Sequence, residues 1–441
     1  MIVRNAAYMK DGEVTGELLK GAVSEHMRNA ARYRRLSDYY HGRTDILGRR
    51  RAPGLPNNRL SHPFARYIVT VTVGYLVGHG IDYKADESAR EALNALKDAM
   101  RLCDIGSVDT ENARNAAIYG RGIEYITLSD DGRRPVSYAL NPESAFVVYS
   151  DDIRHRPLFG VYLMKTSDEE GRQTGMSALV ATEKSISVFD RTNTGFVPVT
   201  REIHFFGGVP MVEFWNDENE KGDFEWVMSL IDAYDALQSD RLNDKDQFVD
   251  KLLVLTGCTL ETDEDGRPPW LQLRQDKALC LPDGDARAEY LSGEMDEQGN
   301  EILRRSLERD IHKLSLVPDL SDDSFAGNVS GVAMKYKLMG LEQLAAMKQR
   351  WFSEGLKERL RIWLSCPVMR EKAELAGAIS PVFTRALPEN LSETASVVKT
   401  ARQAGAMSTR TMVELLHRAD DWDEGMIAKE AEEARRERED G

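Results

Sequence analysis

The sequence predicts an α+β protein whose helix- and strand-forming stretches are followed by long helices. Three observations support this class. Apolar residues recur every three to four positions over residues 16–122, and they alternate with polar residues over 123–215. Beyond residue 222, two long helical patterns lie on either side of a turn-rich stretch at 258–300. Helices and strands in separate stretches are typical of α+β folds, and 441 residues allow roughly two to four domains.

The helical part near the N-terminus contains four predicted helices. The first runs from Gly16 to Tyr40, and Gly42 stands where a C-terminal cap is expected. A loop at 49–59, rich in proline, glycine and asparagine, leads to a second helix from Pro63 to Val77. Two shorter amphipathic helices are predicted at 86–100 and 110–122.

Strands are predicted after residue 122, where the apolar period changes. Residues 123–140 indicate a hairpin around an Asp-Asp-Gly turn. Alternating apolar and polar residues then predict further strands at 145–150, 158–165, 177–182, 185–199 and 209–215. Residues 1–222 are therefore predicted to form one domain with a mostly antiparallel sheet.

The remaining residues predict long helices with one β insert. A helix over 224–257 would be about 48 Å long, and Leu242 is its only apolar residue between Gln238 and Gln247. So polar a segment suits a helix that packs against its own copies in a ring. Next come the β insert, a helix over 301–317 and a helix over 332–364 with seven Lys or Arg and three Glu. Residues 389–438 predict two or three more helices.

The loop Pro318–Gly331 is unusual because it separates two of these long helices. It is acidic, and Gly327 and Gly331 permit backbone conformations that other residues resist. Phe325 and Val329 are apolar residues within it. The loop can be a moving part of an assembly or an ordinary surface connection, and the residue pattern alone favours the second interpretation.

No motif predicts catalysis, a cofactor or a metal. The sequence has no phosphate-binding loop, and Ser330 is misplaced for a serine nucleophile motif. Asp109, Glu111 and Glu124 are a possible carboxylate set that the sequence cannot place together. The eight histidines are scattered, and the four cysteines show no pairing or metal-ligand spacing. A net charge of −15 argues against tight binding of nucleic acid.

Several long stretches resemble the portal proteins of tailed double-stranded DNA bacteriophages, in the family typical of siphophages of Gram-positive hosts. The resemblance covers about residues 16–430 and is weakest at 258–300. It rests on YYHGRTDIL, PNNRLSHPFARYIVTVTVGYLVG, AAIYGRGIEYITLSDDG, FVVYSDD, LIDAYDALQSDRLNDKDQFVDKLLVLTG and DDSFAGNVSGVAMKYKLMGLEQLA.

The resemblance implies a ring of about twelve subunits at one capsid vertex, which conducts DNA and is not an enzyme. The implied partners are further copies of the chain, double-stranded DNA in transit, the terminase packaging motor, the head–tail adaptor, and the major capsid and scaffolding proteins. The implied location is the virion, after assembly in the host cytoplasm. The alternative is a soluble, hydrolase-like enzyme with an unrecognised active site. The implied divisions are a wing (1–222), a stem (223–257 and 301–317), a clip (258–300), a tunnel loop (318–331), a long helix with its connection (332–379) and a crown (380–441).

The resemblance also gives roles to particular residues. Lys335 and Lys337 would recur around the channel and make weak phosphate contacts. The clip would bind partners, and Trp270 is either an interface anchor or part of the clip's own core. The residues assigned to the clip are Arg267, Trp270 and Arg274, and those assigned to the tunnel loop are Asp319, Asp322, Asp323, Ser324, Phe325, Gly327, Asn328, Val329 and Gly331.

Overall fold

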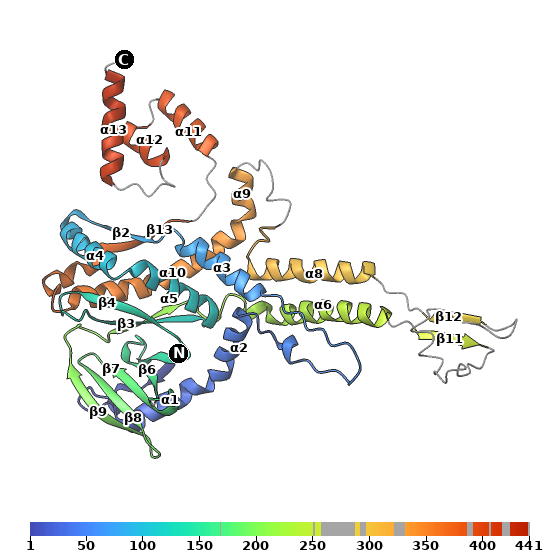
Figure 1. Ribbon diagram of the computed structural model, residues 1–441. Helices are drawn as coiled ribbons and strands as arrows, with labels where there is room; N and C mark the ends of the chain where they lie inside the picture. The colour runs from blue at the N-terminus through green and yellow to red at the C-terminus, as the bar shows by residue number, and fades with distance from the viewer. Residues whose placement is uncertain are drawn as a thin grey trace. The chain divides into compact units, whose positions relative to one another are not determined.

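A computed structural model describes most of the chain and divides it into two compact units (Figure 1). The described residues are 1–167, 169–249, 252–256, 287–291, 297–321, 331–385, 391–404, 407–416 and 424–439. The first unit comprises Met1–His41, Phe64–Trp226 and His312–Gly441. The second comprises Gly42–Pro63 and Val227–Ile311. The α+β class is confirmed.

The larger sheet of the first unit has six strands in the order β1-β5-β6-β7-β8-β9. All neighbours are antiparallel except β1 and β5. Its apolar face packs against the first helix through Leu19, Val23, Phe146 and Phe159. The strands are β1 (Ile2–Arg4), β5 (Ala145–Ser150), β6 (Pro157–Ser167), β7 (Gln173–Ala181), β8 (Ser185–Arg191) and β9 (Phe196–Ile203).

The predicted helix Gly16–Tyr40 is interrupted in the structure. It forms α1 (Gly16–Arg28) and α2 (Ala30–Tyr40), and Asn29 lies between them as C-cap of one and N-cap of the other. Asparagine favours helix ends over helix interiors, which accounts for the break. Gly42 has a φ of +74°, as expected for a glycine that follows a helix. A short 3₁₀ helix, η1 (Ala6–Tyr8), precedes α1.

A second sheet of the first unit has three strands in the order β10-β3-β4. These are β3 (Arg121–Leu128), β4 (Pro135–Leu140) and β10 (Met211–Trp215). Helices α3 (Phe64–Val77), α5 (Ile105–Tyr119) and α10 (Met339–Ser365) complete this part. The rings of Phe214 and Phe352 join β10 to α10, with centroids 4.8 Å apart. A Cβ atom at Gly355 would lie 2.5 Å from the Phe214 ring, so only glycine permits this approach.

The first unit also contains a two-stranded sheet that the sequence pattern did not reveal. In it, β2 (Ile81–Ala85) pairs with β13 (Ile379–Phe383), from near the other end of the chain. Beside it are η3 (Glu87–Ala89), α4 (Arg90–Leu102) and η6 (Arg370–Ala378). The helices predicted within 389–438 are confirmed as α11 (Leu391–Gln403), α12 (Thr409–Leu416) and α13 (Glu424–Glu439).

The predicted helix over 332–364 is also divided. It forms α9 (Gly331–Lys337) and then α10, with Leu338 between them. Leu338, between the two helices, is buried. The backbone hydrogen bonds continue through the break, because Leu338 N donates to Met334 O and Glu342 N donates to Leu338 O.

The second unit contains two helices, a strand pair and the segment 42–63. The helix predicted over 224–257 is shorter than expected: after η4 (Glu225–Val227), α6 covers Met228–Val249, about 33 Å. Residues Leu252–Thr256 instead form β11, antiparallel to β12 (Arg287–Leu291), as suits a short run of leucine and valine. Helix α8 (Glu297–Ser315) begins before the predicted residue 301. On its predicted apolar face Ile311 is buried, whereas Leu303 and Leu314 are exposed. The segment contains η2 (Asp45–Gly48).

Candidate functional site

Tyr67 on α3 holds the first residues of the loop predicted at 318–331. Its hydroxyl donates a hydrogen bond to Pro318 O at 2.8 Å and accepts one from Leu320 N at 2.9 Å. Its ring meets that of His312 edge-on, with centroids 5.5 Å apart. His312 Nδ1 in turn lies 3.0 Å from Val317 O. These contacts hold the residues that follow α8. The role of Tyr67 could not be predicted from the residue pattern.

Asp319 is the one acidic residue of that loop that the structure describes. Its Oδ1 accepts hydrogen bonds from the backbone N and the hydroxyl of Ser321, at 2.9 and 2.6 Å. Partial burial opposes the charge, but the bonds from Ser321 hold the pKa of Asp319 below its ordinary value. Gly331 is the first residue of α9. The predicted loop residues outside the described part are Asp322, Asp323, Ser324, Phe325, Gly327, Asn328 and Val329.

Lys335 and Lys337 lie on α9, and Lys335 is exposed. Glu342, the first carboxylate after them in the sequence, accepts a hydrogen bond from Tyr75 Oη at 2.7 Å and from Arg385 Nε at 3.2 Å. Burial and the bond to Glu342 raise the pKa of Tyr75. The predicted clip residues Arg267, Trp270 and Arg274 lie outside the described part of the chain.

Four of the seven basic residues of 332–364 form ion pairs within the chain, two of them in the interior. Lys348 and Arg359 are buried, and each forms ion pairs with buried carboxylates. Lys357 and Arg361 pair with glutamates three residues earlier on α10, at 2.7 and 2.6 Å. Lys348 and Arg359 are therefore engaged inside the fold, and Lys357 and Arg361 have partners on their own helix.

Asp109 and Glu124, which the sequence could not place together, meet at Arg359. Arg359 lies 2.6 Å from Asp109 and donates through Nε to Glu124 at 2.8 Å. Glu111, the third candidate, is exposed and apart from this cluster. Burial raises the pKa of Asp109 to about 6 although Arg359 opposes the shift. All three charged groups are buried, which indicates a cluster that holds α5, β3 and α10 together and not a catalytic site.

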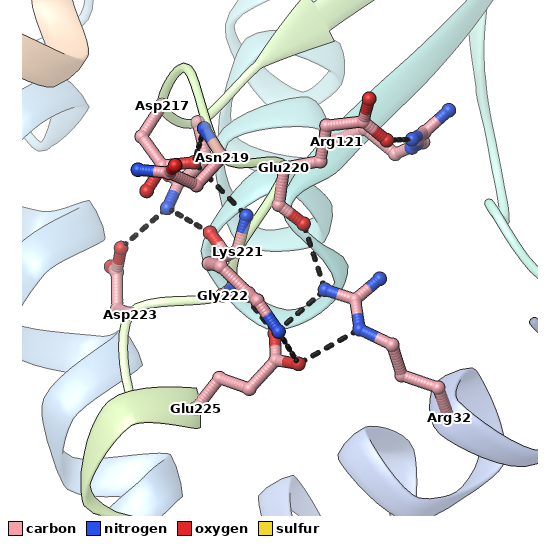
Figure 2. Close-up of polar contacts among 10 residues, drawn as sticks. Arg32, Arg121, Asp217, Asn219, Glu220, Lys221, Gly222, Asp223 and Glu225 are labelled. Carbon is pink, nitrogen blue, oxygen red and sulfur yellow. Dashed lines mark hydrogen bonds and ion pairs between the residues drawn. The ribbon is translucent and has the colours of Figure 1, made fainter. Parts of the chain in front are cut away.

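The segment 216–225 after β10 carries a connected set of polar contacts (Figure 2). Arg32 of α2 forms a two-pronged contact with Glu225, at 2.8 and 2.6 Å, and donates to Glu220 O at 2.7 Å. Arg121 of β3 pairs with Glu213 at 2.8 Å and with Glu220. Burial opposes the charge of Glu225, but Arg32 and Lys221 hold its pKa below the ordinary value.

The backbone of this segment is fixed as firmly as its side chains. Asp217 Oδ1 accepts from Asn219 N and Lys221 N, at 3.0 and 2.9 Å. Glu220 has a φ of +58°, and its carbonyl oxygen would lie 2.1 Å from a Cβ atom at Gly120. Glycine at position 120 therefore lets α5 end against this segment. The sequence signal was only a glycine after a helix.

Asp223 connects the segment to two helices. Its carboxylate accepts from Lys348 Nζ of α10 at 2.7 Å, from Thr72 Oγ1 of α3 at 2.6 Å and from Asn216 Nδ2 at 2.8 Å. All four side chains are buried or nearly so. This network holds the end of the segment against α3 and α10 within the first unit.

The polar middle of α6 has a role within the second unit. Asp235, Ser239 and Asn243 are fully buried at four-residue spacing. They accept hydrogen bonds from the backbone N atoms of every second residue of an extended stretch, at 2.9, 3.0 and 2.6 Å, the donors being His62, Leu60 and Asn58. Four residues of helix advance about 6 Å and two residues of extended chain about 6.6 Å, so the spacings match.

This ladder of hydrogen bonds between α6 and the segment 42–63 was not predicted from the sequence. Its signal was present as Asp, Ser and Asn at positions i, i+4 and i+8 in a helix with little apolar content. Thr44 Oγ1 also donates to Asp235, at 2.5 Å, and Arg49 and Arg51 pair with Asp240.

Among the described residues, no group of His, Cys, Asp and Glu is arranged to hold a metal ion. Within the same residues, no helix is long and apolar enough to cross a membrane. Cys103 and Cys366 are both free thiols, and burial raises the pKa of each.

Comparison with known proteins identifies the family. Residues 21–441 match the family described as phage portal protein, SPP1 Gp6-like. The portal protein of Bacillus phage SPP1 is 26% identical over 383 residues, covering 81% of this chain and 72% of that protein. The portal protein of Clostridium phage phiCD119 is 20% identical over 375 residues, covering 78% and 81%. The chain belongs to the SPP1 Gp6-like family of phage portal proteins, as the sequence resemblance predicted.

Proposed function

We propose that the chain assembles into a ring of about twelve copies at one capsid vertex and conducts double-stranded DNA during packaging and ejection. The observation that carries the proposal is the family match over residues 21–441. The net charge of −15 also suits a channel that DNA traverses without lasting contacts. The buried charge clusters support a structural role, and the ring is not itself an enzyme.

The proposed parts of the subunit follow the sequence resemblance. Residues 1–222 form the wing, 223–257 and 301–317 the stem, and 258–300 the clip. Residues 318–331 form the tunnel loop, 332–379 the helix that leads away from it, and 380–441 the crown. The polar contacts of the segment 216–225 lie at the proposed end of the wing, which supports a boundary there.

The proposed partners differ between parts. The clip meets the terminase motor during packaging and the head–tail adaptor afterwards, while capsid and scaffolding proteins contact the ring during assembly in the host cytoplasm. Trp270, with Arg267 and Arg274, is the proposed anchor of the clip. Trp270→Ala is expected to weaken binding of the motor or adaptor while the ring still forms. Loss of the ring would place Trp270 in the clip's own core instead.

Light scattering of the purified protein tests the proposal. A ring has a mass of several hundred kilodaltons, many times the 49.7 kDa of one chain. Electron micrographs are expected to show rings with a central hole. A monomer to tetramer would contradict the proposal and favour the alternative of an enzyme with an unrecognised site.

A further inference from the structure

The segment Gly42–Pro63 has a charge opposite to that of the chain around it. It contains five arginines and one aspartate, which give it a net charge of +4. Since the whole chain has a net charge of −15, the other residues together have a net charge of −19. The segment has 22 residues and one short 3₁₀ helix. Connections of this length without longer regular structure are usually functional in compact domains.

The segment is held against α6 by its backbone and by several of its side chains. Asn58, Leu60 and His62 donate their backbone N–H groups to the ladder on α6. Arg59, which lies between two of these donors in the sequence, is exposed. Arg59 Nη1 also donates to Leu47 O at 2.6 Å, which steadies its direction.

The exposed surface of the segment combines leucine with arginine. Leu47, Leu55 and Leu60 are 39, 51 and 37% exposed, and Arg50 and Arg59 are exposed as well. Exposed leucines add nothing to binding of a phosphate backbone, whereas apolar side chains mixed with arginine are typical of protein interfaces. This composition favours a protein partner with acidic groups over nucleic acid.

We propose that the segment 42–63 is a subunit contact, and that its leucines and arginines dock on the acidic surface of a second copy of this chain. The inference rests on the proposed ring, in which each copy has a neighbour. A cyclic ring needs two different complementary surfaces on each subunit. Arg49 and Arg51 pair with Asp240 within the chain, whereas Arg50 and Arg59 are exposed and the rest of the chain has an excess of acidic residues, so charges of opposite sign are present for such a contact. Helix α6 was expected to face its own copies, and the segment covers the polar side of that helix.

The test compares two double variants by light scattering and calorimetry. Arg50→Glu with Arg59→Glu is expected to leave mostly monomers at concentrations where the wild-type protein is a ring, with at least a tenfold weaker assembly. The control is Arg133→Glu with Arg154→Glu, two exposed arginines in turns of the first unit, and it should keep the ring. Arg50→Lys with Arg59→Lys, which keeps the charge, should also keep it. Leu55→Asp should weaken assembly without any loss of arginine.

The possible outcomes separate the inference from the proposed function. If the wild-type protein itself forms no ring, the proposed function fails. If it forms a ring and the Arg50/Arg59 double variant does too, the inference is wrong and the ring stands. Loss of the ring in the Arg133/Arg154 control as well would show a general effect of added acidity and would also overturn the inference. A melting temperature of the monomer within a few degrees of wild type excludes misfolding, since the backbone ladder to α6 is retained.

Discussion

Lys348 of α10 donates to both carboxylate oxygens of Asp223, at 2.7 and 2.5 Å, and both side chains are buried. Asp223 lies just before α6, and α10 follows α9, which begins where the proposed tunnel loop ends. This ion pair therefore connects two parts of the first unit that lie 125 residues apart in the sequence.

Lys348→Met is expected to lower the free energy of unfolding by about 3–5 kcal/mol, because it leaves the Asp223 carboxylate buried without its ion-pair partner. Adding Asp223→Asn should recover part of the loss, since the double variant buries no unpaired charge. Lys357→Met is the control: its pair with Glu354 is exposed, so its loss should cost under about 1 kcal/mol. Denaturant unfolding measures all four proteins. An equal decrease in the free energy of unfolding in Lys348→Met and Lys357→Met would show that the buried ion pair contributes no more to stability than the exposed one.

Asp109→Asn is expected to change how stability depends on pH. Burial raises the pKa of Asp109 to about 6 from an ordinary value of 3.8, so between these values the folded state binds the proton that the unfolded state releases. Stability contributed by this group is therefore present below about pH 4 and declines as pH rises toward 6, with a slope of at most about 1.4 kcal/mol per pH unit. The asparagine variant should lack this decline. Unfolding curves at pH 4, 5, 6 and 7 would test it, and identical slopes in the two proteins would contradict it.

The main elements could be predicted because their signals are local. The hairpin around the Asp-Asp-Gly turn is confirmed as β3 and β4, and the helix beginning at Pro63 is confirmed as α3. The turn residues and the proline act within a few positions of themselves. The predicted end of the helix over 224–257 was wrong, because residues 252–256 form a strand that pairs with β12. The spacing of apolar residues along the sequence could not indicate this pairing.

The polar sites could not be predicted because they join distant residues. Arg359 lies 235 positions from Glu124, and nothing near either residue marks the pair. The sequence pattern did not indicate that polar residues in the middle of α6 bond within the chain, and the prediction that this helix packs against its own copies stays a prediction. Only the structure shows that Ser239 faces the backbone of the segment 42–63. Family resemblance predicted the function correctly, since it draws on many positions at once.

Replacing Lys335 and Lys337 by Gln is expected to weaken DNA retention or slow packaging while assembly is spared. Both residues lie on α9, and repeated around a ring they would make many weak, salt-dependent phosphate contacts. Lys165→Gln with Lys184→Gln removes the same charge from the region of the six-stranded sheet and serves as control. DNA protected in particles would be measured at two salt concentrations. Normal packaging and retention in the Lys335/Lys337 variant would count against a channel role.

Gly327→Pro and Gly331→Pro test whether the proposed tunnel loop moves. Proline fixes its own φ and restricts the residue before it, so within a hinge it should reduce motion more than stability. Gly331 is the first residue of α9, a position where proline is well tolerated. Gly331→Pro is therefore expected to package DNA at close to the wild-type rate and to serve as a matched control. Gly327→Pro should form rings of normal size and melting temperature and build into procapsids.

The difference between these two variants should appear only when DNA moves. Procapsids that contain Gly327→Pro are expected to package DNA several-fold more slowly or to lose it afterwards, whereas Gly331→Pro procapsids are not. The measurement is the amount of DNA protected from nuclease over time in a packaging reaction, with ring mass checked beforehand. If Gly327→Pro packages as fast as wild type, the loop is not a moving part, and its glycines serve only as a connection. If its rings fail to form, the loop is required for folding or assembly instead.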